Sequence, residues 1–201
     1  MEILAATEKY VTGLFKNSTD ESLVYHNLDH TKSVVQAAKF IGEQCGINGD
    51  GSMETLLLAA WFHDLGYLVS KTNHEDASKE LASKFLKSQG VKPEVISQVE
   101  QCIEATRIPQ KPQDKLSAIL CDADLFYFSQ EDFIESSQVY WDELYALTRQ
   151  KLDKAKYLEI TLRFLNLHEF KSEYGKTILE QGKALNLAKI KKSLIKARKV
   201  S

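Results

Sequence analysis

Glycine and proline are scarce in this sequence, with nine Gly and three Pro among 201 residues. A turn-dense fold relies on both residue types, so their scarcity argues against an all-β sandwich or barrel and excludes collagen-like and proline-rich chains. The chain also lacks an excess of charge, because 26 Lys and Arg face 28 Asp and Glu, for a formal net charge of −2. We therefore expect no strong electrostatic attraction to nucleic acid or to an anionic membrane.

Long apolar runs and paired cysteines are missing as well. No stretch approaches the roughly 18 apolar residues that a membrane span needs. The first four residues, Met-Glu-Ile-Leu, lack the basic and apolar regions of a secretory signal. Cys45, Cys102 and Cys121 are an odd number without C-x-x-C spacing, which favours free thiols over disulfides or a zinc–thiolate site. We therefore expect a cytoplasmic protein without a membrane segment.

Helical periodicity, in contrast, is present in nearly every segment. No segment alternates with the period of two that half-buried strands show. Residues 56–62, Leu-Leu-Leu-Ala-Ala-Trp-Phe, are apolar on all sides, which is typical of a helix at the centre of a fold. We predict an all-α fold with one domain over residues 1–201. Its motif-bearing core is expected at 25–126 and its C-terminal helices at 129–201.

Capping residues predict several helix ends. Ser52 is expected to cap the central helix, and Ser129 with Asp132 resembles a capping box for a later one. Residues 116–128 have the pattern of one continuous apolar helix. The segment 181–201 carries seven Lys or Arg and no acid. A terminal helix with an ordinary packing face explains this segment better than contact with a polyanion does.

His63 and Asp64 follow the central apolar helix directly. An ionised carboxylate at the end of a buried helix is costly unless another charge compensates it. A divalent metal ion would do so. The alternative is structural, with His63 bonded to a backbone carbonyl and Asp64 capping the next turn, and the dipeptide alone favours this alternative.

His26 and His30 are spaced by four, which would place both on one face of a helix, one turn apart. The alternative is a capping segment in which Asn27 or Asp29 is the N-cap and the histidines are incidental. The pair of histidines alone does not decide between these interpretations.

Asp122 and Asp124 are two residues apart. On a helix they would point in roughly opposite directions, so at most one of them faces a given site. The alternative is a helix N-terminus, where acidic residues interact favourably with the helix dipole.

In combination, these residues resemble the motif of the HD-domain superfamily of metal-dependent phosphohydrolases. That motif is a lone His, a His-Asp pair at the end of an apolar helix, and a distal Asp in an Ala-Asp-x-Leu context. The resemblance implies that His30, His63, Asp64 and Asp124 are the metal ligands, and it selects Asp124 over Asp122. Small predicted bacterial members share four motifs with this chain: Tyr-His-Asn-x-x-His at 25–30, Trp-Phe-His-Asp-x-x-Tyr at 61–67, Ile-x-Ala-Thr at 103–106 and Asp-Ala-Asp-Leu at 122–125.

The resemblance implies an all-α HD fold and the hydrolysis of a phosphomonoester or phosphodiester, with a nucleotide as the expected substrate. Imidazole and carboxylate ligands suit a divalent transition metal, namely Mn, Fe, Co, Ni or Zn, with Mg possible. The expected partner is a small-molecule phosphate ester. A homodimer is possible, whereas neither a membrane nor a nucleic acid is an expected partner.

The first motif is also similar to that of the cyclic-nucleotide phosphodiesterases. In that family the His beside Tyr protonates the leaving group and the second His binds metal, which implies that His26 is a general acid and His30 a ligand. Independently of that family, Asp64 is a candidate catalytic residue that could bridge to a second metal, although the sequence offers no obvious second set of His ligands. The chain departs from that family after Asp64, where Leu-Gly-Tyr replaces Asp/Glu-His-Pro-Gly. A nucleotide sensor or scaffold that binds metal without turnover is the alternative outside enzymes.

Asn27, His74 and Arg107 are the candidate substrate contacts. His74 precedes Glu75, as His or Asn precedes Glu near the metal of other HD proteins, and a helix cap is the alternative. Arg107 could meet a phosphate, although solvated surface arginines are more common. Tyr67 stands where alarmone hydrolases and some 5′-nucleotidases of the superfamily have Glu, so these two activities rank lower.

Overall fold

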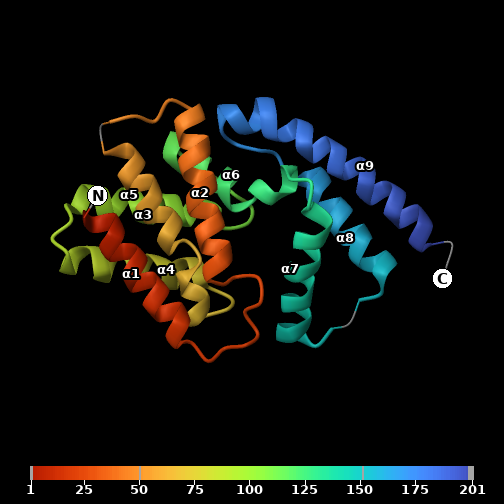
Figure 1. Ribbon diagram of the computed structural model, residues 1–201, viewed down its shortest axis with the longest axis horizontal. Helices are drawn as coiled ribbons and strands as arrows, with labels where there is room; N and C mark the ends of the chain where they lie inside the picture. Colours follow the sequence, from red (N-terminus) through yellow and green to blue (C-terminus); the bar gives the residue numbers. More distant parts are fainter. Residues whose placement is uncertain (1, 50, 151, 199–201) are drawn as a thin grey trace.

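The computed structural model describes residues 2–49, 51–150 and 152–198, which form helices and no strands (Figure 1), so the all-α prediction is confirmed. Within these ranges no helix is long and apolar enough to cross a bilayer. The N-terminal helices are α1 (Glu2–Asn17), α2 (Leu28–Gln44), α3 (Ser52–Phe62), the 3-10 helix η1 (Leu65–Leu68), α4 (His74–Ser88), α5 (Pro93–Thr106) and α6 (Lys115–Asp124). The C-terminal helices are the 3-10 helix η2 (Phe126–Ser129), α7 (Phe133–Thr148), α8 (Lys154–Leu167), the π-helix η3 (Gly175–Leu179) and α9 (Glu180–Ala197).

The apolar helix α3 is the centre of the N-terminal helices. It packs against α1, α2, α4, α5 and α6. Leu56, Ala59 and Phe62 are fully buried, since a helix that is apolar all round finds neighbours on every side. The end of α3 therefore carries His63 and Asp64 into the interior, where both side chains are buried.

A close approach of two backbones follows directly after Asp64. Gly66 in η1 lies against the first turn of α4, and a Cβ at this position would be only 1.9 Å from His74 O. Gly66 N donates a hydrogen bond to Ser78 Oγ at 2.8 Å. Only glycine fits such an approach, which brings the start of α4 beside the end of α3.

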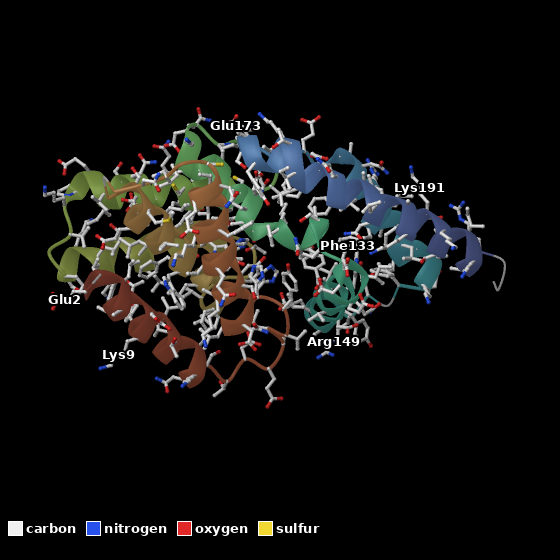
Figure 2. All side chains as sticks on the ribbon, turned by 45° about the horizontal axis from the view of Figure 1, so that its top comes forward. Glu2, Lys9, Phe133, Arg149, Glu173 and Lys191 are labelled. Carbon is white, nitrogen blue, oxygen red and sulfur yellow. The ribbon has the colours of Figure 1, made fainter. Side chains whose placement is uncertain are left out.

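The C-terminal helices lie to one side of the N-terminal helices (Figure 1), with α9 packed against α8 and η2. Asn186 on α9 donates hydrogen bonds to Phe128 O at 2.9 Å and Gln130 O at 2.7 Å. Figure 2 shows Phe133, at the start of α7, near the middle of the molecule, where the two groups of helices meet. Residues 199–201 of the basic segment lie outside the described residues.

Three expected helix ends are wrong. Ser52 is the first residue of α3, and Gly51 is the N-cap. Asp132 is the N-cap of α7 without a side-chain cap bond, and the capping box joins Asp114 to Ser117 at the start of α6. The segment 116–128 is divided between α6 and η2, because the chain turns after Asp124 and η2 packs against α9.

Candidate metal centre

His63 is fixed by the last turn of α3. Its Nδ1 lies 2.8 Å from Ala60 O. Because a carbonyl oxygen only accepts, Nδ1 carries the proton of the neutral ring, and Nε2 presents a lone pair. Nε2 lies 3.2 Å from Asp64 Oδ2 and 3.5 Å from Asp124 Oδ1. The backbone bond expected for a structural histidine is thus present, and it aims the other nitrogen at two carboxylates.

His30 enters the same cluster from the first turn of α2. The side chain of Asn27 caps α2 by accepting from the backbone N–H groups of Asp29 and His30. His30 Nε2 lies 3.3 Å from Asp64 Oδ2 and 3.4 Å from Asp124 Oδ1. Because the Asn27 cap starts the helix at Leu28, His26 precedes α2, and the prediction that His26 and His30 share one helical face is wrong.

Asp122 and Asp124, both in the last turn of α6, face different surroundings, as their spacing predicts. Asp124 faces the two histidines, whereas Asp122 accepts hydrogen bonds from the backbone N–H groups of Lys171 (2.6 Å) and Ser172 (2.8 Å). A Cβ on Gly175 would lie 2.1 Å from Asp122 Oδ2, so this contact needs a glycine. Asp122 thus ties the C-terminal segment to α6, and Asp124 is the one that joins the cluster.

The cluster provides four ligand atoms that all lie within 4.8 Å of one another, and they come from His30, His63, Asp64 and Asp124. Among the described residues, neither His30 Nε2 nor His63 Nε2 has a hydrogen-bond partner, although both atoms are buried. Buried polar atoms are rarely left without a partner. Two imidazole lone pairs and two carboxylates form a donor set that fits a divalent transition metal, so these residues form a possible metal site.

Electrostatics in the cluster favour added positive charge. Burial acts to raise the pKa of Asp64 and Asp124, but the two histidines outweigh it, holding Asp64 well below its ordinary value and Asp124 at about 2. Burial acts to lower the pKa of His30 and His63, but the two carboxylates outweigh it and raise both. A buried pair of carboxylates therefore attracts a cation, whether protons on the imidazoles or a metal ion between them.

His26 lies beside the cluster and is oriented by α7. Its Nδ1 is bonded to Glu143 Oε1, and Glu143 Oε2 accepts from the backbone N–H groups of Tyr25 (2.8 Å) and His26 (2.9 Å). Burial acts to raise the pKa of Glu143, but its bonds to His26 outweigh it and lower the pKa. A carboxylate accepts the Nδ1 proton, so Nε2 is left free to exchange a proton, and it lies 4.0 Å from Asp64 Oδ2.

Tyr67 is stacked between His26 and His74. Both ring-centroid distances are 4.0 Å, with interplanar angles of 15° and 19°. His74 Nε2 lies 3.6 Å from Asp64 Oδ1 and 3.4 Å from Glu75 Oε1. Burial lowers the pKa of His74 and so favours its neutral form. His74 is therefore at the edge of the cluster, and its contact with substrate stays a prediction.

Arg107 forms ion pairs with three carboxylates. Its Nη1 lies 3.0 Å from Glu75 Oε2, its Nη2 3.2 Å from Asp76 Oδ1 and its Nε 2.7 Å from Glu104 Oε1. Arg107 thereby holds Glu75 beside the cluster, and its contact with a phosphate stays a prediction. The same holds for Asn27, whose side chain caps α2.

The sequence-based reasoning missed Glu143, which lies 117 residues after its partner His26. Nothing in the sequence separates this residue from the exposed acids of α7, because its burial depends on how α7 packs against the turn at Tyr25 and His26. It also missed the aromatic stack, since the ring of Tyr67 meets the two histidines only after η1 folds against α4.

Comparisons with known proteins agree with this geometry. The family model described as HD domain matches residues 27–127, about half of the chain, and this range contains the four candidate ligands. The chain resembles the crystal structure of a predicted HD superfamily hydrolase from an uncultured Thermotogales bacterium, with a TM-score of 0.55 and 21% identity over 81% of this chain and 91% of that chain. At this identity the likeness shows the fold alone, and no curated protein matches the chain significantly. The motif residues, their convergence and the family match together show that the chain belongs to the HD-domain family.

Proposed function

We propose that this protein is a metal-dependent hydrolase of phosphate esters, with a divalent transition metal held by His30, His63, Asp64 and Asp124. The observation that carries the proposal is the convergence of two partnerless, buried imidazole nitrogens with two carboxylates. The structural relative is described as a predicted HD superfamily hydrolase, which names the broader class of the reaction proposed here.

A bound divalent ion would supply Lewis-acid polarisation of a phosphoryl oxygen and would acidify water. Mn, Fe, Co, Ni and Zn suit this donor set, and Mg is possible. Asp64 is the ligand nearest to both His26 and His74, at 4.0 and 3.6 Å. We assign it the second task of holding the attacking water by a hydrogen bond.

His26 is the proposed general acid. Hydrolysis breaks the bond between phosphorus and the leaving oxygen, and that oxygen must gain a proton. Glu143 fixes the Nδ1 proton of His26, so Nε2 is the nitrogen that donates to the leaving oxygen and later recovers a proton from water. This division of roles is what the likeness of the first motif to cyclic-nucleotide phosphodiesterases predicts.

The substrate class is a small-molecule phosphomonoester or phosphodiester, and nucleotides are the class that the family resemblance predicts. We treat residues 1–201 as one HD-type domain, and a homodimer is compatible with the proposal. The three cysteines are free, which fits the proposed location in the reducing cytoplasm.

The test combines metal analysis with a substrate panel. Purified protein is expected to contain a transition metal by mass spectrometry and to hydrolyse at least one member of a panel, releasing phosphate from a monoester or a nucleoside monophosphate from a cyclic nucleotide. That panel contains nucleoside mono-, di- and triphosphates, cyclic nucleotides, and alkyl and aryl phosphates. Metal content without any turnover across the panel would contradict the hydrolase and favour a nucleotide sensor or scaffold.

A further inference from the structure

The cavity at the candidate metal centre extends well beyond the candidate ligands. It has a volume of about 380 Å³ and reaches from His26, Asp64 and Asp124 to the space between α7 and α8. This size lies within the range typical of small-molecule sites, about 300–1,000 Å³. We call its far part the C-terminal chamber, which is lined by Phe133, Tyr140, Trp141, Ile160, Phe164 and Leu165.

Three polar side chains in the wall of the cavity around the C-terminal chamber, Ser137, Trp141 and Thr161, already have partners within the protein. Trp141 Nε1 donates to Thr161 Oγ1 at 2.9 Å, and Thr161 Oγ1 donates to Tyr157 O at 3.0 Å. Ser137 Oγ is 2.7 Å from Tyr157 Oη and donates to Ile134 O at 2.9 Å. A ligand with many polar atoms would lose its own hydrogen bonds to water here without regaining them. The chamber thus favours an apolar group.

The charge of the cavity restricts the other end of the ligand. Among its lining residues there is no Lys or Arg, and its acidic residues are Asp64, Glu75 and Asp124. Arg107, the neighbouring cation, is shared among three carboxylates. Polyphosphate chains are generally bound by several cationic side chains. A cavity with these acids and one metal site therefore suits a single phosphate group.

We infer that the substrate is the phosphate ester of a bulky apolar alcohol, either aromatic or aliphatic, with one phosphate group at the metal centre and its apolar part in the C-terminal chamber. This inference rests on the proposed function and narrows its substrate class. It ranks nucleoside di- and triphosphates below apolar monophosphates, because no Lys or Arg lines the cavity to compensate their extra negative charge.

A series of n-alkyl phosphates tests the inference, because the leaving alcohols beyond ethanol hardly differ in acidity while their apolar area grows. Each added methylene that enters the chamber is expected to raise kcat/KM by about fourfold, the equivalent of ~0.8 kcal/mol. The affinity of the matching alkylphosphonates, which are not hydrolysed, is expected to rise in parallel when measured by calorimetry on the metal-loaded protein.

Two variants of α8 test whether the rise in kcat/KM with alkyl chain length arises in the C-terminal chamber. Ile160→Phe fills part of the chamber and is expected to end the rise at a shorter chain, whereas Ile160→Ala is expected to extend it. The two substitutions act in opposite directions, so loss of folding in one leaves the other informative. Leu167→Phe is the matched control, since Leu167 lies on the same helix with 71% of its surface exposed.

The outcomes separate this inference from the proposed function. Affinities and rates that do not change with chain length, or a higher kcat/KM for AMP than for hexyl phosphate, would overturn the inference and leave a phosphate ester hydrolase. Phosphonate affinity that rises with chain length in the absence of any turnover would support the chamber as an apolar ligand site and overturn the hydrolase.

Discussion

The N-terminal and C-terminal helices contribute different kinds of residue to the candidate site and its cavity. The candidate ligands His30, His63, Asp64 and Asp124 all come from the range that matches the HD-domain model. The C-terminal helices, which lie almost entirely outside that range, contribute Glu143 and most of the apolar wall. The candidate metal ligands thus lie in the range matched by the family model, whereas the helices after it hold the Glu143 partner of the proposed acid His26 and line the proposed substrate chamber.

The largest expected effect comes from replacing a candidate metal ligand of the N-terminal helices. His63→Ala or Asp64→Ala removes a ligand, so we expect metal content near zero and loss of hydrolysis, both measured on the purified variants. Adding a chelator to the wild type should lower its Tm, because an ion at 100 times its Kd contributes ~2.7 kcal/mol to stability. His168→Gln, in the C-terminal half, is the control that should keep the metal. Unchanged metal content in both ligand variants would rule out this site.

A smaller effect is expected at the contact between the two groups of helices. His26→Ala should keep the metal and lower kcat by about 10²–10⁴-fold on alkyl phosphates, whose leaving groups need protonation. Aryl phosphates with acidic leaving groups should be affected less. Glu143→Gln should lower the same rate by about 10–10²-fold, since it disturbs only the orientation of His26.

Metal analysis of the His26 variant decides its role. If His26→Ala loses the metal as His30→Ala is expected to do, then His26 is a ligand rather than an acid. If neither metal content nor rate changes, His26 has no part in the reaction.

Asp122 and Asp124 form a natural pair of variants for separating stability from chemistry. Asp122→Ala leaves the N–H groups of Lys171 and Ser172 without their acceptor. We expect it to lower the free energy of unfolding by about 2–3 kcal/mol while metal content stays unchanged. Asp124→Ala should instead lose metal. Urea unfolding and metal analysis of both variants check this contrast, and metal loss in the Asp122 variant would argue against it.

The smallest effect concerns His168, buried in the C-terminal half. Burial lowers its pKa to about 4, and among the described residues neither ring nitrogen has a hydrogen-bond partner. Because the unfolded chain binds the proton near pH 6.5, its stabilising effect is complete above that pH and is lost as the pH falls toward 4. Between pH 7 and 5.5 the loss should be about 1 kcal/mol, or about 2–4 °C in Tm.

Comparison with His168→Gln isolates this contribution, since other groups titrate in both proteins. The acid-induced fall in Tm should be shallower in the variant. Parallel Tm curves for the two proteins would show that His168 does not contribute to acid sensitivity.

Local sequence patterns were sufficient for the helices and for the ligand candidates. The apolar stretch at 56–62 predicts a central helix because a surface apolar on all sides must be buried on all sides. Pro93 is the first residue of α5, a position that proline suits because its missing N–H would have no helical partner there. Caps were less predictable: Gly51 and Asp132 are the N-caps where Ser52 and Ser129 were expected, and neither makes a side-chain cap bond.

The sequence by itself determined the all-α fold, the family and the four candidate ligands, because the helical period and each short motif around His30, His63-Asp64 and Asp124 can be recognised from neighbouring residues. Only the tertiary structure decided that Glu143 bonds to His26 and that an apolar chamber adjoins the candidate metal centre. These features depend on side chains more than 100 positions apart along the chain. An acid on α7 looks the same in the sequence whether it faces solvent or a histidine, and packing between helices is what distinguishes the two.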